Sequence, residues 1–252
     1  MGENYKLYNG DCLEIMKDIP DKSIDMILCD LPYGVTKNKW DSVIPFDKLW
    51  EQYNRIITDN GAIVLFAQGM FTSDLMQSNK KMWKYNLIWD KDRTSGFLNA
   101  KRMPLRSHED VCIFYKKQPI YNPQMWEGKP SHSIGKVKGE KVCKNNNNYG
   151  NFGRVEREGT LKYPRSILKF SKPHPPIHPT QKSVALCEWL IKTYTNPNMT
   201  ILDNCMGSGT TGVATINAGE GRKFIGIELD ENYFNITKER IENTINNKKT
   251  LL

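Results

Sequence analysis

The sequence lacks the patterns that mark several large classes of protein. Its six cysteines are scattered along 252 residues with no C-x-x-C pair, so neither a disulfide framework nor a zinc site is expected. No apolar run approaches the roughly 18–20 residues that span a bilayer, and the N-terminal residues do not resemble a secretory signal. We therefore expect a cytoplasmic protein with no membrane span and no bound metal.

Apolar side chains are plentiful, and the positive charge is concentrated in one segment. Apolar residues make up 38% of the sequence and aromatic residues 10%, enough for a folded core. The net charge is +8, yet residues 116–172 hold thirteen Lys and Arg against four Asp and Glu, which leaves the rest of the chain at −1. Six aromatic residues are interspersed among these cations. This composition suits a surface insertion that binds nucleic acid, and also a solvated loop with a few packed aromatics.

Outside that segment, short apolar runs alternate with amphipathic patterns, which is the rhythm of an α/β fold. Strands are expected at residues 5–8, 24–29, 62–67, 85–89, 111–115, 200–203 and 224–228. Helices are expected at residues 12–17, 46–57, 72–79, 183–194, from a glycine-rich turn to 218, and at 232–245 before a frayed tail. A turn at Asn60-Gly61 is expected to precede the third strand.

Two of the predicted strands end in a carboxylate that is followed by an unusual turn. Asp30 opens the turn Asp30-Leu31-Pro32-Tyr33-Gly34, and Asp203 opens a glycine-rich stretch that reaches Gly212. In an open parallel sheet, ligands bind beyond the carboxyl ends of the strands, where the strand order reverses. We therefore expect these two strands to be neighbours and their turns to face one pocket.

Gly207, Gly209 and Gly212 form a G-x-G-x-x-G between a predicted strand and a predicted helix. Such glycines permit a tight turn and close approach of a ligand, while Glu228, at the end of the next strand, can bind two ribose hydroxyls. The pattern indicates a cofactor that contains adenosine, although a plain strand-to-helix connection would use the same glycines. In an NAD-dependent oxidoreductase several strands follow this turn. Here only one strand and one helix follow, so the N-terminal half must complete a circularly permuted sheet.

The segment Asp30-Leu31-Pro32-Tyr33 resembles the D-P-P-Y motif of DNA amino-methyltransferases, with Leu31 in place of the first proline. A basic insertion and then the glycine-rich turn follow it, an order similar to that of the β class of S-adenosylmethionine-dependent DNA methyltransferases. Four other segments also resemble this family, namely Asn9-Gly10-Asp11, Arg106-Ser107-His108-Glu109, His178-Pro179-Thr180-Gln181-Lys182 and Gly226-Ile227-Glu228. The resemblance implies a circularly permuted Rossmann-like α/β sheet with helices on both faces and an inserted target-recognition region.

The motif also suits the methylation of an exocyclic amino group. The nitrogen lone pair of such a group is delocalised into the base, so acceptors must hold both N–H bonds and direct the lone pair at the methyl. The carboxylate of Asp30 and the backbone carbonyl of Leu31 can accept these two bonds. Pro32 fixes the turn, and Tyr33 can stack on a base that has been flipped out of the duplex. Taken alone, the pentapeptide would also suit an ordinary turn.

The resemblance also assigns a cofactor site. Asp11 would contact the adenine of S-adenosylmethionine, although this aspartate would suit a helix N-cap equally well. Asp203 and the turn after it would bind the methionine end, and Trp40 and Asp41 could lie on a loop over the flipped base. The expected cofactor-binding residues are Asp11, Cys12, Asp30, Thr180, Gln181, Lys182, Asp203, Asn204, Cys205, Gly207, Ser208, Gly209, Thr210, Thr211, Glu228 and Leu229.

Three parts of the chain are expected from this comparison. They are a catalytic half at residues 1–115, a basic target-recognition insertion at 116–172 that binds double-stranded DNA, and a cofactor-binding half at 173–252. The expected function is N6 methylation of adenine, because aspartate as the first motif residue is commoner in the adenine enzymes of the family. A homodimer is expected because many members are dimers. The alternatives are an N4-cytosine methyltransferase, an NAD-dependent oxidoreductase and a non-catalytic nucleic-acid-binding module.

Overall fold

The structure of the chain is a computed structural model that describes residues 4–35, 41–129, 160–173 and 181–250. It consists of two units, one made of Met1–Asn122 with Arg165–Leu252 and the other of Pro123–Pro164. The first unit contains an eight-stranded sheet, and the second a two-stranded sheet of β6 (Trp126–Glu127) and β7 (Leu161–Lys162). No helix in the described ranges is long and apolar enough to cross a membrane.

The order of the strands in the large sheet is β1-β10-β9-β2-β3-β5-β4-β8. β1, β10, β9, β2 and β3 run parallel, whereas β5 is antiparallel to both β3 and β4. The C-terminal strands β9 and β10 therefore lie between β1 and β2, which confirms the predicted α/β fold and its circular permutation. The strands are β1 (Tyr5–Asn9), β2 (Ile24–Cys29), β3 (Ile57–Ala67), β4 (Trp83–Ser95), β5 (Arg106–Phe114), β8 (Ile167–Lys169), β9 (Thr200–Asp203) and β10 (Lys223–Glu228).

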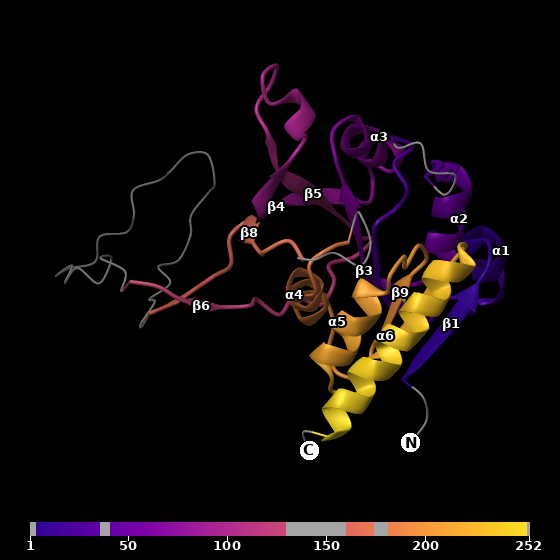
Figure 1. Cartoon of the computed structure of the whole chain (residues 1–252). Coiled ribbons are helices and arrows are strands. Elements are labelled where there is room, and N and C mark those ends of the chain that lie inside the picture. The colour runs from indigo at the N-terminus through magenta and orange to yellow at the C-terminus, as the bar shows by residue number, and fades with distance from the viewer. Residues whose placement is uncertain (1–3, 36–40, 130–159, 174–180, 251–252) are drawn as a thin grey trace, which may run out of the picture. The chain divides into compact units, whose positions relative to one another are not determined.

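Helices cover both faces of this sheet because the buried strands are apolar on both sides (Figure 1). On β2, Ile27 and Cys29 belong to a core with α2 (Phe46–Ile56) and α3 (Met70–Ser78), and α1 (Cys12–Ile15) packs at its edge. Met26 and Leu28 belong to a core with α4 (Val184–Tyr194) and α5 (Thr210–Ala218). Such a continuous apolar strand is typical of a parallel sheet with two covered faces.

The turn expected before the third strand is a bulge inside β3. Between the pairs Ile24–Ile57 and Met26–Ala62, residues 58–61 lie opposite the single residue Asp25, so β3 carries three extra residues there. Gly61 fits there because a Cβ atom at this position would lie 2.9 Å from the backbone oxygen of Asp25. The glycine that indicates a turn in the sequence therefore allows a close approach between two strands.

The C-terminal helix and the basic segment also differ from expectation. The helix α6 (Glu231–Thr250) does not fray at Lys248, whose ammonium donates to the backbone oxygen of Ile216 at 2.6 Å, near the C-terminal end of α5. β8 lies within the range expected for the insertion, yet it pairs with β4 in the large sheet. The role of residues 116–172 in target recognition stays a prediction.

Candidate active site

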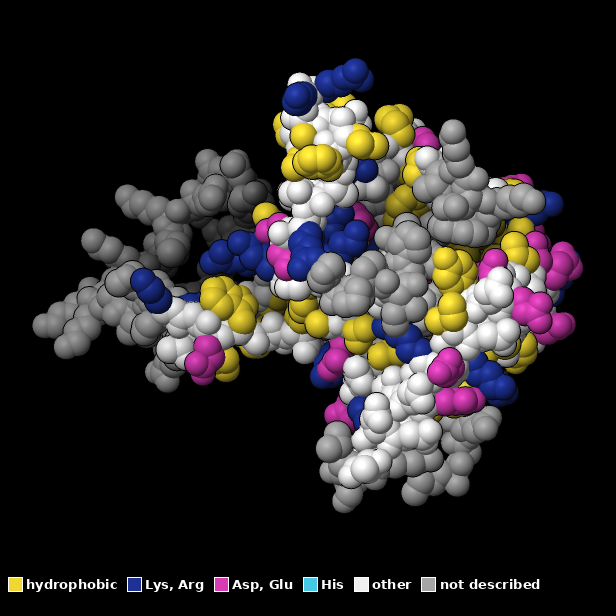
Figure 2. Space-filling view, viewed as in Figure 1, with side chains coloured by type: hydrophobic (Ala, Val, Ile, Leu, Met, Phe, Trp, Pro, Cys, Tyr) yellow, Lys and Arg dark blue, Asp and Glu magenta, His cyan; other side chains and the backbone are white. Residues whose placement is uncertain are grey.

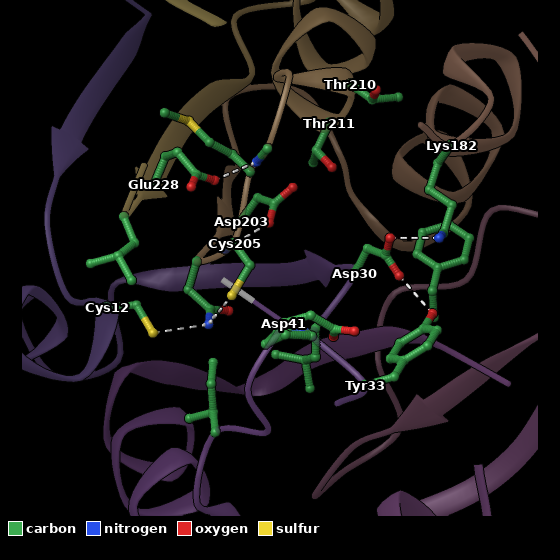
Figure 3. A pocket seen from close by; sticks show the side chains of 18 of the residues that line it. Cys12, Asp30, Tyr33, Asp41, Lys182, Asp203, Cys205, Thr210, Thr211 and Glu228 are labelled. Atoms are coloured by element: carbon green, nitrogen blue, oxygen red, sulfur yellow. Dashed lines mark hydrogen bonds and ion pairs between the residues drawn. The ribbon is translucent and has the colours of Figure 1, made fainter. Parts of the chain in front are cut away.

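A cavity of about 430 Å³ lies at the carboxyl ends of β1, β2, β9 and β10. Ligand pockets have volumes of roughly 300–1,000 Å³. Both Tyr33, after β2, and Ser208, after β9, line the cavity, and the two strands are hydrogen-bonded neighbours. The expectation that the two turns face one pocket is confirmed (Figure 3).

Most of the residues predicted for the site line this cavity. They are Asp11, Cys12, Asp30, Leu31, Pro32, Tyr33, Gln181, Lys182, Asp203, Asn204, Cys205, Gly207, Ser208, Thr210, Thr211, Glu228 and Leu229. Gly209 is not among the lining residues. Thr180 and Trp40 lie outside the described residues.

The glycine-rich turn is held between the cavity and α6. Gly209 has a φ of +77°, and a Cβ atom on it would lie 2.5 Å from Cγ2 of Thr237. Gly212 lies on α5, where a Cβ would lie 2.6 Å from Cδ1 of Ile241. A Cβ on Gly207, by contrast, would meet nothing within 4 Å. Gly209 and Gly212 thus allow close packing against α6, whereas Gly207 leaves the cavity open.

Carboxylates dominate the part of the cavity formed by β1, β9 and β10. Glu228 accepts the Gly207 N–H at 2.8 Å and the Asp230 N–H at 2.9 Å. Asp11 accepts the Leu13 N–H at 2.7 Å and caps α1, as its alternative interpretation expected, while it also lines the cavity. Glu228 and Asp11 therefore present carboxylates to a ligand, so this region of the cavity favours a cationic group.

Asp203 is the most strongly buried carboxyl of that region, with 4% of its surface exposed. Burial raises the pKa of Asp203 to about 7, although hydrogen bonds from Thr211 and from the Cys205 backbone oppose the shift. Its neighbour Asn204 accepts the hydroxyl of Tyr53 at 2.5 Å and contacts Sγ of Cys12 at 3.6 Å. The end of β9 is thereby tied to α2 and α1, which fixes the floor of the cavity.

The turn after β2 carries a carboxylate whose two oxygens are both hydrogen-bonded. Asp30 accepts the hydroxyl of Tyr33 at 2.6 Å on Oδ1 and the ammonium of Lys182 at 2.5 Å on Oδ2. Its side chain keeps 24% of its surface exposed, so a ligand in the cavity can still reach it. The ring of Tyr33 stacks on Phe71 with centroids 4.7 Å apart. The aspartate is thus oriented from two sides and remains accessible.

Asp41 holds the other end of the same turn. Its two carboxylate oxygens accept the backbone N–H groups of Gly34 at 2.8 Å and Val35 at 3.0 Å. Asp41 is buried and lines the cavity. A place for Asp41 on a loop over the flipped base stays a prediction, and its role as an anchor of the turn was not expected.

A chain of buried charges extends from Asp30 to β4 and β5. Lys182 lies 3.2 Å from Oε2 of Glu109, and Lys91 lies 2.8 Å from Oε1 of the same carboxylate. Among the described residues, Oε2 of Glu109 is the one buried side-chain oxygen without a hydrogen bond of good geometry. Its contact with Lys182 is therefore mainly electrostatic.

The charges in this chain shift one another's ionisation. Burial raises the pKa of Asp30, and the ammonium of Lys182 opposes that shift. Burial also opposes ionisation of Glu109, yet the ammoniums of Lys182 and Lys91 hold its pKa below the usual value. The two carboxylates likewise raise the pKa of Lys182 against the effect of burial. The opposite charges of Lys182 and the two carboxylates therefore offset part of the cost of burying Asp30, Glu109 and Lys182.

Sequence reasoning found Asp30 and Lys182 but assigned no role to Glu109 and Lys91. Lys91 and Glu109 lie on the two strands of one hairpin, whereas Lys182 lies about 70 residues after Glu109. No spacing rule connects these three positions. The segment Arg106-Ser107-His108-Glu109 gave a signal for Glu109 through its resemblance, without a role. No signal in the sequence marks Lys91. The described part of the chain contains no group of three or more His, Cys, Asp or Glu residues that could hold a metal ion.

The N6/N4 DNA methylase family model matches residues 24–239. The chain belongs to this DNA methylase family. The match extends from β2 to α6 and includes both turns of the cavity, the basic segment and the strands between them. The resemblance that the two motifs indicated is therefore confirmed.

Individual proteins of known sequence or structure agree with this assignment. DNA adenine methyltransferase YhdJ of Escherichia coli (strain K12) is 27% identical over 94% of this methylase and 82% of its own length. The crystal structure of the M1.HpyAVI–SAM complex matches 94% of this chain and 99% of that one, with 28% identity and a TM-score of 0.62. The PvuII cytosine-N4-specific methyltransferase has a TM-score of 0.67 over 98% of this chain and 93% of its own. At 16% identity, it shows the shared fold alone.

Proposed function

We propose that this methylase transfers the methyl group of S-adenosylmethionine to the N6 amino group of adenine in double-stranded DNA. The observation that carries the proposal is that Asp30 and the carboxylates of Asp11, Asp203 and Glu228 line one cavity. Bound S-adenosylmethionine supplies a methyl group that its sulfonium already activates. The task of the protein is therefore to place an amino nitrogen in line with that methyl and to hold its protons.

Asp30 and Leu31 divide this task between them. The free lone pairs of the Asp30 carboxylate accept one N–H of the amine, and the Leu31 carbonyl accepts the other. Lys182 favours the ionised form of the carboxylate against the effect of burial, and the ionised form can stabilise the positive charge that develops on the nitrogen. After transfer, the surplus proton of the nitrogen passes to Asp30 and from there to solvent. Because Tyr33 is fixed by Asp30 and Phe71, its ring stays in place for a flipped base to stack on.

The charges in the cavity favour S-adenosylmethionine over NAD. The pyrophosphate of NAD requires free N–H groups at the glycine-rich turn, but the Gly207 N–H is already bound to Glu228. The lysines that line the cavity are Lys91, Lys172 and Lys182 among the described residues, and the first and last of them are paired with Glu109 and Asp30. A sulfonium cation fits beside the carboxylates at the other end.

Adenine is proposed over cytosine on two grounds. The first motif residue, Asp30, is the one that is commoner in the adenine enzymes of the family, and YhdJ is by its name an adenine methyltransferase. N4-cytosine methylation is the second candidate, because both bases present an exocyclic amine and the same acceptors would serve.

Long-read sequencing of DNA from cells that express this chain in a methylation-free host tests the proposal. We expect N6-methyladenine in a defined sequence context. Detection of N4-methylcytosine in its place would favour the second candidate. The absence of both modified bases, with folded protein in the cells, would contradict the proposed function.

The affinity for S-adenosylmethionine is expected to rise with pH. A cationic ligand binds more tightly when the neighbouring Asp203 is ionised, and its pKa of about 7 makes ionisation incomplete at neutral pH. Calorimetry should show an increase of up to about tenfold between roughly pH 6 and pH 8. The Asp203→Asn variant should lose this component and retain only the titration of the ligand itself. Equal pH profiles for both proteins would show that Asp203 does not face the cationic part of the ligand.

The basic segment is expected to supply much of the affinity for DNA. Replacing Lys136, Lys138, Lys141 and Lys144 by glutamine should weaken binding and flatten its salt dependence by about 0.9 in log–log slope for each phosphate that is no longer neutralised. The matched control replaces four exposed lysines elsewhere, Lys6, Lys80, Lys81 and Lys238. An equal change of slope in both variants would indicate a general charge effect and no dedicated insertion.

The expected homodimer is tested separately by sedimentation of the purified chain.

A further inference from the structure

The hairpin between β4 and β5 ends in apolar side chains that belong to no core. Phe97 exposes 82% of its surface and Leu98 exposes 96%, and both lie in the helical turn Phe97–Asn99. Neither residue belongs to any of the three hydrophobic clusters that the described residues form. Exposed apolar groups of this size, close together, are typical of an interaction site.

The tip of the hairpin is a hydrogen-bonded turn. The Asn99 N–H donates to the Gly96 oxygen at 2.9 Å, and the Ala100 N–H donates to the Phe97 oxygen at 3.0 Å. The Arg102 N–H donates to the Asn99 oxygen at 2.8 Å. Gly96 has a φ of +88°, which lets the chain leave β4 and enter this turn. The two apolar side chains are therefore presented from a preformed turn.

Cations surround the tip. Arg93, Lys101, Arg102 and Arg106 are all exposed, and Asp92 is the single acidic residue in the range 91–106. In Figure 2 the projection at the top of the molecule carries dark blue cationic side chains next to yellow apolar ones. A nucleic-acid duplex carries its phosphates on the outside and its stacked bases inside. Apolar side chains flanked by arginine and lysine suit such a ligand, because the cations can bind phosphates while the apolar groups contact bases.

Strand β4, which leads to the tip of the hairpin, forms part of the cavity. Lys91 and Ser95, both on β4, line the cavity together with Asp30. A duplex that places a target base in the cavity must therefore pass close to the hairpin. Base flipping leaves a gap in the stack, and an apolar side chain inserted there stabilises the opened duplex.

We propose that Phe97 and Leu98 are a wedge that enters the DNA duplex beside the target base, while the surrounding arginines and lysine bind the flanking phosphates. This inference rests on the proposed function, because it requires a DNA duplex as the substrate. It adds a DNA-binding element outside residues 116–172. The wedge acts on opening of the duplex and has no contact with the methyl donor.

The test compares the wild-type chain with Phe97→Ala/Leu98→Ala on duplexes that carry the target sequence found by long-read sequencing. In one duplex the target base is paired, and in the other it lies opposite an abasic site, which removes most of the work of flipping. We expect the variant to lose at least about tenfold in methylation rate on the paired duplex and to regain most of the wild-type rate on the abasic one. Fluorescence of 2-aminopurine at the target position should fall in the variant complex.

Tyr8→Ala serves as the matched control, since Tyr8 is also exposed but lies on β1, at the opposite edge of the sheet. It should leave both rates unchanged. An equal loss of rate on the two duplexes, or no loss on either, would overturn the wedge. Conversion of a dimer to a monomer by the double substitution would overturn it too and would assign the tip to a second copy of the chain. If the wild-type chain methylates neither duplex, the proposed function fails and not the wedge alone.

Discussion

Asp30→Ala is expected to lower the rate of methyl transfer by about a thousandfold or more at saturating substrate, because it removes an acceptor that acts on the reacting amine. The variant loses the orientation of the amine and the negative charge beside the nitrogen at the same time. Lys182 retains Glu109 as a partner, so the surrounding structure has a counter-ion left. Single-turnover measurement of transfer from labelled S-adenosylmethionine to DNA gives the rate of the chemical step.

The affinity for the methyl donor should change by less than about tenfold in the same variant, because the main partner of Asp30 is the target amine. Asp30→Asn is the matched control. It keeps one acceptor oxygen and the shape of the side chain but loses the charge, so its loss of rate separates the effect of charge from that of orientation. Loss of donor affinity in both variants, with the transfer step intact, would place Asp30 in the cofactor site alone.

Local patterns in the sequence located seven strands of the large sheet and the two turns, although β3, β4 and β5 are longer than expected and β8 was not predicted. β2 and β9 begin and end at the expected residues, because each is a short apolar run that ends in an aspartate. The cavity also follows from general rules, since parallel strands in a permuted sheet bring their carboxyl ends together. The residues that line it could therefore be predicted in large part.

Contacts between distant parts of the chain could not be predicted in this way. The β3 bulge depends on how closely β2 approaches, and the end of α6 depends on carbonyls of α5 that accept from Lys248. The same holds for the pairing of Lys91 with Glu109, which requires the register between β4 and β5. Propensity and periodicity describe each segment separately, so such pairings appear only once the sheet is assembled.

Lys182→Met is expected to move the acidic limb of the pH–rate profile to higher pH. Burial raises the pKa of Asp30, and Lys182 is the group that opposes this, so its removal raises the pKa further. Less Asp30 is then ionised at neutral pH, and methyl transfer should fall there, by about tenfold for each pH unit by which the raised pKa exceeds the assay pH. Raising the pH should restore most of the rate, which a merely misfolded variant would not show.

Glu109→Gln should shift the same limb in the opposite direction. The carboxylate of Glu109 raises the pKa of Asp30, so its neutralisation lets Asp30 ionise at lower pH. Stability provides an independent readout. Without Lys182, two buried carboxylates lack their shared cation, a change that costs about 3–5 kcal/mol when both are ionised. The folded pKa of Asp30, which burial already raises, then rises further, so the stability of Lys182→Met should be nearest to wild type in acid and decrease as pH rises. Parallel shifts of the two variants in the same direction would show that Lys182 and Glu109 act on the rate by some route other than the ionisation of Asp30.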